Sequence, residues 1–241
     1  MSESEVRVRF DAGLRTLMTS RRRGPEVRVA HDGTSSLGHV VESLGVPLPE
    51  VGGLAAGGRP VEASYRPRPG DVVEVHAVRR PERLPDGSPP RFLLDVHLGA
   101  LARRLRLVGA DTAYRNDLDD PALVDLANAQ RRVLLTRDRG LLRRRALWRG
   151  AFVRGSRPDE QLTDVLDRFA PPLAPWTRCT ACNGTLAPVA KAEIAHLLGP
   201  GTRRTQESFT RCRDCGRVYW PGAHHRRLEE VVAAAARTVR R

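Results

Sequence analysis

The chain has 241 residues, enough for two or three small domains, and a formal net charge of +13 at pH 7. No stretch approaches the length of a membrane-spanning helix, and the first residues, MSESEVRVRF, lack the apolar core of a signal peptide. These features argue against a membrane or secreted protein, and we expect a soluble, cytoplasmic one.

The positive charge is unevenly distributed along the chain. Residues 1–90 carry 13 basic and 12 acidic side chains, residues 91–170 carry 16 and 11, and residues 171–241 carry 12 and 5. Affinity for a polyanion is therefore expected in the second and third segments. A GC-rich coding bias is an alternative source of the arginines, because Lys191 is the only lysine. Proline and glycine cluster at 81–90, and proline clusters again at 171–175. These breaks predict a domain over 1–80, a linker over 81–90, a domain over 91–170 and a last domain over 171–241 that ends in a helix.

Residues 5–79 predict a small mixed fold. Alternating apolar residues indicate strands at 6–10 and 27–29, with further strand residues at Val61 and at 73–75. Ser35 and Ser36 are candidate caps for a helix over 37–44.

The run GGRPVEASYRPRPGDVVEVHAV resembles the β-grasp domain of ubiquitin-like sulfur carriers. The resemblance implies a flexible carboxyl-terminal Gly-Gly, which those carriers activate as an acyl adenylate. Here Ala77-Val78-Arg79-Arg80 stands at that place and the chain continues, so the carrier chemistry has no carboxyl group to use. We expect a docking module for a protein partner, and we expect its deletion to leave the activity of the remaining chain intact.

Residues 91–170 predict strands that alternate with helices. Such alternation predicts an α/β fold with a parallel, doubly wound sheet, in which ligands bind at the carboxyl ends of the strands. Strands are expected at 91–94, 110–115, 132–136 and 151–153, and amphipathic helices at 98–108, 123–127 and 160–169.

Aspartates follow three of these strands, at Asp95, Asp117 and Asp138. Clustered carboxylates repel one another unless a hard cation such as magnesium or manganese neutralises them, and such a cation supports phosphodiester cleavage. Taken singly, each aspartate is better explained as a helix cap or turn residue, and Asp119 or Asp120 is a candidate cap of the following helix. The joint placement favours a metal site that includes Asp95 and Asp138.

Arginines surround Asp138, with nine arginines and a single acid from Arg131 to Arg154. The alternative to a functional role is a solvated helix face. Beside a metal site we expect contacts to phosphate groups from Arg137, Arg139, Arg143 and Arg144.

The four cysteines fall in two pairs of CxxC spacing, each followed by turn-forming residues. Four thiolates complete a tetrahedral zinc site, so we expect a structural zinc ion bound by Cys179, Cys182, Cys212 and Cys215. Disulfides or unrelated core thiols are the alternatives. The 29 residues between the pairs leave room for extra strands, and His224 or His225 is an alternative ligand. Tyr219 and Trp220 either stack on bases or pack over the zinc site.

Two long motifs, FLLDVHLGALARRLRLVGADTAYRNDLDD and LVDLANAQRRVLLTRDRGLL, resemble the PIN-like RNase domain named for the Mut-7 C-terminal region. RCTACNGTL and RCRDCGRVYWPGAHH are similar to the zinc ribbon of that family, whose bacterial members also carry a ubiquitin-like amino-terminal domain. The resemblance covers nearly the whole chain. It implies catalytic acids at Asp95, Asp120 and Asp138, with Asp117 as the alternative middle acid.

The resemblance therefore implies a metal-dependent ribonuclease that acts on single-stranded RNA, with magnesium or manganese at the acids and zinc at the cysteines. A non-catalytic RNA-binding or adaptor protein that retains the fold is the alternative. The presence of both Asp95 and Asp138 favours the enzyme.

Overall fold

The computed structural model describes residues 5–30, 32–223 and 225–240. The chain forms two compact units, which we call unit 1 (Met1–Arg80 with Thr136–Phe152) and unit 2 (Pro81–Leu135 with Val153–Arg241). Within the described residues, no helix is both long and apolar enough to cross a membrane.

Unit 1 contains a five-stranded mixed sheet with the strand order β2-β1-β5-β3-β4. Strand β1 pairs antiparallel with β2 and parallel with the central strand β5, while β3 is antiparallel to both β4 and β5. Alternate residues of β1 are buried, as the period of two requires. The strands are β1 (Glu5–Phe10), β2 (Glu26–Ala30), β3 (Val51–Ala56), β4 (Arg59–Val61) and β5 (Val72–Ala77).

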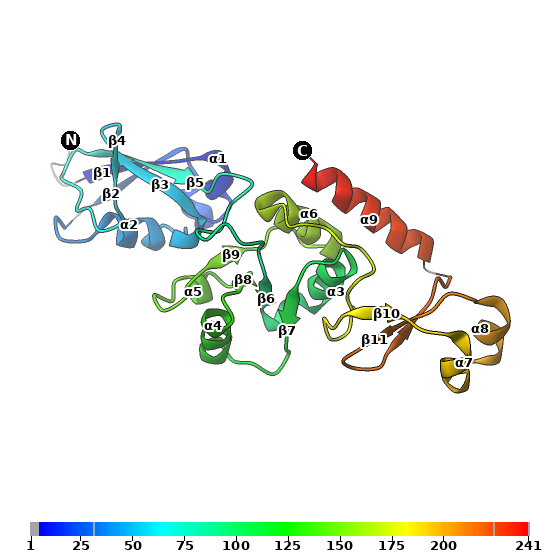
Figure 1. The fold of residues 1–241 in the computed structure, drawn as a ribbon. Helices are drawn as coiled ribbons and strands as arrows, with labels where there is room; N and C mark the ends of the chain where they lie inside the picture. Colours follow the sequence, from blue (N-terminus) through cyan, green and yellow to red (C-terminus); the bar gives the residue numbers. More distant parts are fainter. Residues whose placement is uncertain (1–4, 31, 224, 241) are drawn as a thin grey trace. The chain divides into compact units, whose positions relative to one another are not determined.

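Helix α2 (Leu37–Ser43) covers one face of this sheet (Figure 1). The Ser36 side chain accepts a hydrogen bond from the main-chain N–H of His39, which confirms Ser36 as the helix cap. Leu37, Val41 and Leu44 are fully buried against Val8 and Val73 of the sheet, and they form the core of unit 1. Shorter elements complete this part of the unit: α1 (Ala12–Arg15), η1 (Ser20–Arg22) and η2 (Leu48–Glu50).

Strand β3 is absent from the sequence-based prediction because its glycines hide the apolar alternation. The structure explains the first of them, since the register of β3 against β5 shifts between Val51 and Gly53. A Cβ at Gly52 would lie 2.5 Å from the carbonyl oxygen of Ala77, so the bulge brings the two main chains too close for a side chain.

The remaining elements of unit 1 come from a distant part of the sequence. They are the last residue of β8 (Val133–Thr136), the short helix α5 (Arg139–Leu142) and β9 (Gly150–Phe152). β9 packs beside η2, and Phe152 packs against the core of unit 1.

In unit 2, parallel strands lie side by side in the order β7-β6-β8. β6 (Phe92–Leu94) and Val133–Leu135 of β8 are buried on both faces, as expected for a sheet covered by helices. β7 (Thr112–Tyr114) pairs residue for residue with β6. These strands alternate with helices, so the predicted α/β class with a parallel sheet is confirmed.

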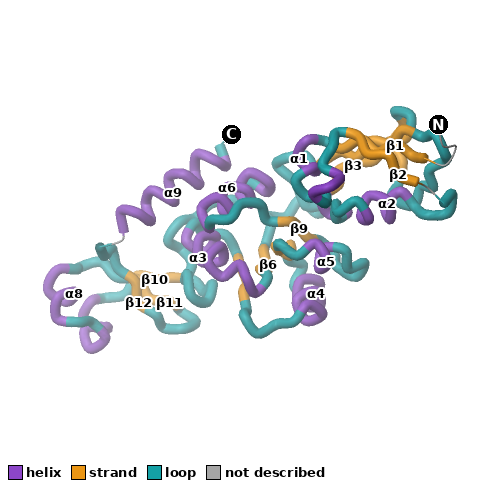
Figure 2. Tube along the Cα trace, turned by 180° about the vertical axis from the view of Figure 1, so that it is seen from behind, coloured by secondary structure: helices purple, strands orange, loops and turns teal. Residues whose placement is uncertain are grey.

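The helices of unit 2 pack in sequence on one another, α3 against α6 and α6 against α9. Both views show α9 alongside α6 (Figure 1, Figure 2). Gly109, with φ of +89°, ends the turn after α3, where a Cβ would collide with the Ala174 main chain. The helices are α3 (Gly99–Leu107), preceded by the turn η3 (Val96–Leu98), α4 (Asp120–Ala129), α6 (Pro158–Phe169) and α9 (His225–Val239).

Residues 81–90, which we expected to be a linker, contact α6 at their beginning. The Glu82 carboxylate forms an ion pair of 2.8 Å with Arg168, whose side chain is 3% exposed. Leu84 is buried as well.

The carboxyl-terminal part of unit 2 holds a small antiparallel sheet, β10-β11-β12. Its strands are β10 (Leu186–Pro188), β11 (Thr210–Cys212) and β12 (Val218–Tyr219). The expected extra strands between the cysteine pairs are present, because β10 and the first residues of β11 lie there. Between these two strands the chain also forms α7 (Lys191–Ile194), η4 (Ala195–Leu197) and α8 (Pro200–Thr205). A small apolar core holds this part, in which Ile194 and Leu198 pack on Phe209.

Candidate active site and metal centre

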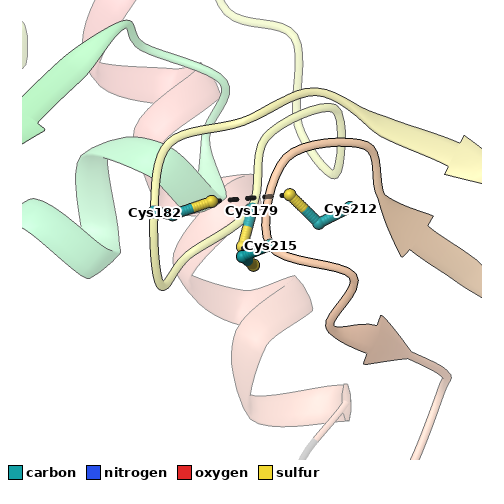
Figure 3. Close-up of side chains that lie close together, drawn as sticks. All are labelled: Cys179, Cys182, Cys212 and Cys215. Carbon is teal, nitrogen blue, oxygen red and sulfur yellow. Dashed lines mark hydrogen bonds between the residues drawn. The ribbon is translucent and has the colours of Figure 1, made fainter.

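The four cysteines converge at one point of unit 2 (Figure 3). Their sulfur atoms all lie within 4.8 Å of one another. Among the described residues, this group of cysteines has ligand atoms close enough together to hold a metal ion. The Sγ atoms of Cys179 and Cys215 are 3.6 Å apart, and those of Cys182 and Cys212 are 3.4 Å apart. All four are free thiols, not disulfides.

Each cysteine pair sits on a tight turn that the local sequence specifies. Asn183 and Gly216 both have positive φ, +75° and +72°, which asparagine and glycine adopt more readily than other residues. The Cys179 N–H donates to the Gly184 carbonyl at 2.7 Å, and the Gly216 N–H donates to the Cys212 carbonyl at 3.1 Å. A Cβ at Gly184 would lie 2.8 Å from the Cys212 sulfur, so glycine is also needed for the second pair to approach.

The sulfur positions fit a tetrahedral ion. Zinc with four Zn–S bonds of about 2.3 Å holds sulfur atoms about 3.8 Å apart, close to the separations found here. The Gly184 N–H also points at the Cys182 sulfur, at 3.4 Å, as expected for a main-chain donor that supports a thiolate. The cluster is therefore consistent with a zinc ribbon.

Aromatic side chains close to the cysteines have different roles. The Tyr219 hydroxyl lies 3.0 Å from the Cys179 sulfur, so this ring packs over the cysteine cluster. Burial, followed by this contact with Cys179, raises the pKa of Tyr219. Trp220 is 42% exposed beside Phe209. His225 stacks on Trp176 and pairs with Glu229, and His224 lies outside the described residues.

The first cysteine pair is docked on the α/β core by residues that sequence reasoning missed. Arg106 of α3 is 3% exposed, and its guanidinium donates to the carbonyls of Thr112, Thr180 and Ala181 at 2.9, 3.2 and 2.7 Å. Burial lowers the pKa of Arg106, whereas the nearby thiols of Cys182 and Cys179 favour its charged form. An arginine in an amphipathic helix normally indicates a solvated face, so the sequence carried no signal for this role.

A second connection runs through Asn183. The Asn183 Oδ1 accepts a hydrogen bond from the Thr112 N–H at 3.0 Å, and the Asn183 Nδ2 donates one to the Asp111 carboxylate at 2.9 Å. Asp111 also pairs with Arg132 at 2.7 Å and with Arg91 at 3.2 Å. Burial alone would raise the pKa of Asp111, but the hydrogen bonds from Arg132 and Asn183 lower it to about 2.

Among the candidate catalytic acids, Asp95 follows β6 directly and is only 7% exposed. Its N–H donates to the Leu135 carbonyl of β8 at 3.0 Å, and its carbonyl accepts from Leu98 at 2.9 Å. The main chain of Asp95 is thus fixed at the carboxyl end of the strand, which is the position that the sequence predicted.

The candidates for the middle acid lie at the start of α4 or just before it. Asp119 is the cap of α4 and accepts from the Ala122 N–H at 3.0 Å. Asp117 pairs with Arg115 at 2.7 Å, and this hydrogen bond lowers the pKa of Asp117. Asp120 is the first residue of α4.

Asp138 belongs to unit 1, whereas Asp95 and Asp120 belong to unit 2, so the clustering of the three acids stays a prediction. Asp138 is exposed and caps α5, because its Oδ1 accepts from the Gly140 N–H at 2.6 Å. The neighbouring arginines, Arg137, Arg139, Arg143 and Arg144, are exposed residues. Two of them also donate to main-chain carbonyls, Arg139 to Leu17 and Arg143 to Glu42, each at 2.6 Å.

Comparison with known proteins gives two family matches. Residues 90–232 match the Mut7-C RNAse domain, and residues 3–83 match the Mut7-C ubiquitin domain. No curated protein and no solved structure matches the sequence. The first match includes Asp95, Asp120, Asp138 and all four cysteines, and it spans more than half of the chain. The fold, the cysteine cluster and the two matches agree, and the chain belongs to the Mut7-C RNAse domain family.

Proposed function

We propose that this protein is a metal-dependent ribonuclease whose catalytic acids are Asp95, Asp120 and Asp138. The observation that carries the proposal is Asp95, a nearly buried carboxylate held at the carboxyl end of a central parallel strand. That edge of a parallel sheet is where ligands bind. Carboxylate oxygens are the ligands that hard cations such as magnesium and manganese prefer, so a carboxylate at this edge suits a cation site.

Asp120, the first residue of α4, is the middle acid in this proposal, as the family resemblance implies, and Asp117 is the alternative. Asp138 contributes a carboxylate whose Oδ1 is engaged by Gly140, and Oδ2 is the oxygen proposed to act as ligand. The oxygen ligands suit magnesium or manganese, which when bound activates a water molecule and stabilises the leaving oxygen. The arginines near Asp138 would neutralise the phosphate groups of the RNA and orient its backbone.

Zinc at the four cysteines has a structural part in the proposal, because four thiolates leave no coordination position for a substrate. The basic residues of the second and third segments would attract RNA, and exposed Trp220 offers a ring for base stacking. The protein partner expected for the ubiquitin-like domain and a cytoplasmic location also remain proposals.

The proposal is tested by cleavage of single-stranded RNA with Asp95→Asn and Asp138→Asn variants. Asparagine preserves shape but removes the charge that holds the cation, so each change should lower the cleavage rate about a hundredfold or more. Asp125→Asn is the matched control, since Asp125 is an exposed aspartate of α4. EDTA should abolish cleavage, and manganese should restore it only in the wild type and the control.

Two results would overturn the proposal. The first is full activity of the Asp95→Asn, Asp138→Asn double variant. The second is RNA binding by the wild type without cleavage under any metal condition, which would favour the alternative of a non-catalytic RNA-binding or adaptor protein.

A further inference from the structure

The ubiquitin-like domain contacts the segment that carries Asp138. We call residues 136–152 the Asp138 segment. Hydrogen bonds hold it to the domain: Arg139 donates to the Leu17 carbonyl at 2.6 Å, Arg143 to the Glu42 carbonyl at 2.6 Å, and the Phe152 N–H to the Glu50 carboxylate at 2.9 Å. Figure 2 shows α5 and β9 of this segment next to α2 of the domain.

The contact at Glu50 is a buried anchor. Glu50 is 2% exposed, and its carbonyl accepts from the Val78 N–H at 3.2 Å, so its main chain is fixed at the junction with β5. The partly buried Phe152 side chain packs against the domain's core. A buried carboxylate is costly to separate from its hydrogen-bond partner, and the partly buried Phe152 ring adds an apolar contact, so this end of the segment is firmly attached.

The segment contains little regular structure and much positive charge. Its helix α5 has four residues, far below the length at which a helix is stable alone. Residues 137–149 carry six arginines and one acid, so the segment repels itself. Its own turns and the buried side chains of Leu141 and Leu142 hold part of the segment, and the domain that accepts its hydrogen bonds holds it further.

We propose that the ubiquitin-like domain is a positioning element for the nuclease site and that Glu50 is its main positioning residue. This inference rests on the proposed function. Glu50 fixes the end of the Asp138 segment at Phe152, while Leu17 and Glu42 fix its middle through Arg139 and Arg143. Together they set the main-chain path that presents the Asp138 carboxylate. The sequence favoured an independent docking module, whereas these contacts give the domain a partner within its own chain.

The test compares Glu50→Ala with Glu42→Ala in the full-length, zinc-loaded protein. Glu50→Ala removes the acceptor of the Phe152 N–H. Glu42→Ala is the matched control, because Arg143 binds the main-chain carbonyl of Glu42 and that carbonyl remains. Hydrogen exchange of residues 136–152 measures how firmly the segment is attached to the domain. The rate of RNA cleavage measures whether that attachment matters for activity. Exchange of β1 and β5 verifies that the domain stays folded.

Glu50→Ala should accelerate exchange in the Asp138 segment about tenfold or more. It should lower kcat by a similar factor with little change in KM, and raise the manganese concentration for half-maximal activity. Glu42→Ala should behave as the wild type.

If Glu50→Ala leaves the exchange of the segment unchanged while β1 and β5 stay protected, Glu50 does not anchor the segment. Faster exchange with an unchanged kcat would overturn the positioning role. A wild-type protein that protects the segment but cleaves no RNA would instead refute the proposed function.

Discussion

Removal of the Arg106 side chain should loosen the cysteine cluster from the α/β core. In Arg106→Ala, the carbonyls of Thr112, Thr180 and Ala181 lose their donor. An unsatisfied buried acceptor costs about 1–3 kcal/mol. The Thr180 and Ala181 carbonyls are only partly buried, so water molecules can replace some of the lost hydrogen bonds. We expect about 3 kcal/mol in total, which corresponds to roughly a 150-fold increase in local opening.

The charge of Arg106 adds to this effect when zinc is bound. Four thiolates and one zinc ion carry a net charge of about −2, and the Cys182 and Cys179 thiols already favour the charged guanidinium. Loss of the cation should therefore also speed the release of zinc to a chelator.

Hydrogen exchange of residues 106–112 and 179–184, together with the rate of zinc release, measures both effects. Arg103→Ala is the matched control, because Arg103 is an exposed arginine of the same helix. It should change stability by no more than about 0.5 kcal/mol. An Arg106→Ala protein with less than about a threefold change in exchange and zinc release would refute the assigned role of Arg106.

Other expectations concern the same region. The purified protein should contain one zinc ion per chain, and Cys212→Ser should release the ion and unfold the ribbon, because metal binding is coupled to folding. Elemental analysis and hydrogen exchange of residues 106–112 and 179–184 measure these effects. A wild-type protein that is folded and reduced but contains no zinc would contradict the prediction. Asp111, with a folded pKa of about 2 and an ordinary value of 3.8, contributes stability that is fully present above about pH 4 and lost toward pH 2. The advantage of wild type over Asp111→Asn in urea unfolding should therefore shrink from pH 4 to pH 2. This difference in the free energy of unfolding should be at most about 2 kcal/mol, and solvent screening reduces it because the Asp111 side chain is 22% exposed. A difference that does not depend on pH would refute the assignment.

The sequence by itself determined the fold class and the local chemistry of this protein. Period-two alternation at Val6, Val8 and Phe10, the cap at Ser36 and the fully apolar strand residues 92–94 are local signals, and the structure confirms each of them. The paired CxxC spacing likewise predicted the cysteine cluster, because a tight turn after each pair requires only the neighbouring residues. Where backbone geometry interrupted the pattern, as at the bulge beside Gly52, the strand was missed.

Only the tertiary structure decided which side chains join distant parts of the chain. Arg106, Asn183 and Asp111 connect the first cysteine turn to the α/β core, yet in sequence they are an arginine in a helix, a turn asparagine and a loop aspartate. Asp119 and Asp120 are adjacent, and only the observed hydrogen bond to Ala122 identifies the cap. Glu50 and Phe152 are 102 positions apart, so no local pattern could pair them. Such contacts depend on the energy of burying polar groups with partners from elsewhere, and that energy is fixed only when the whole chain has folded.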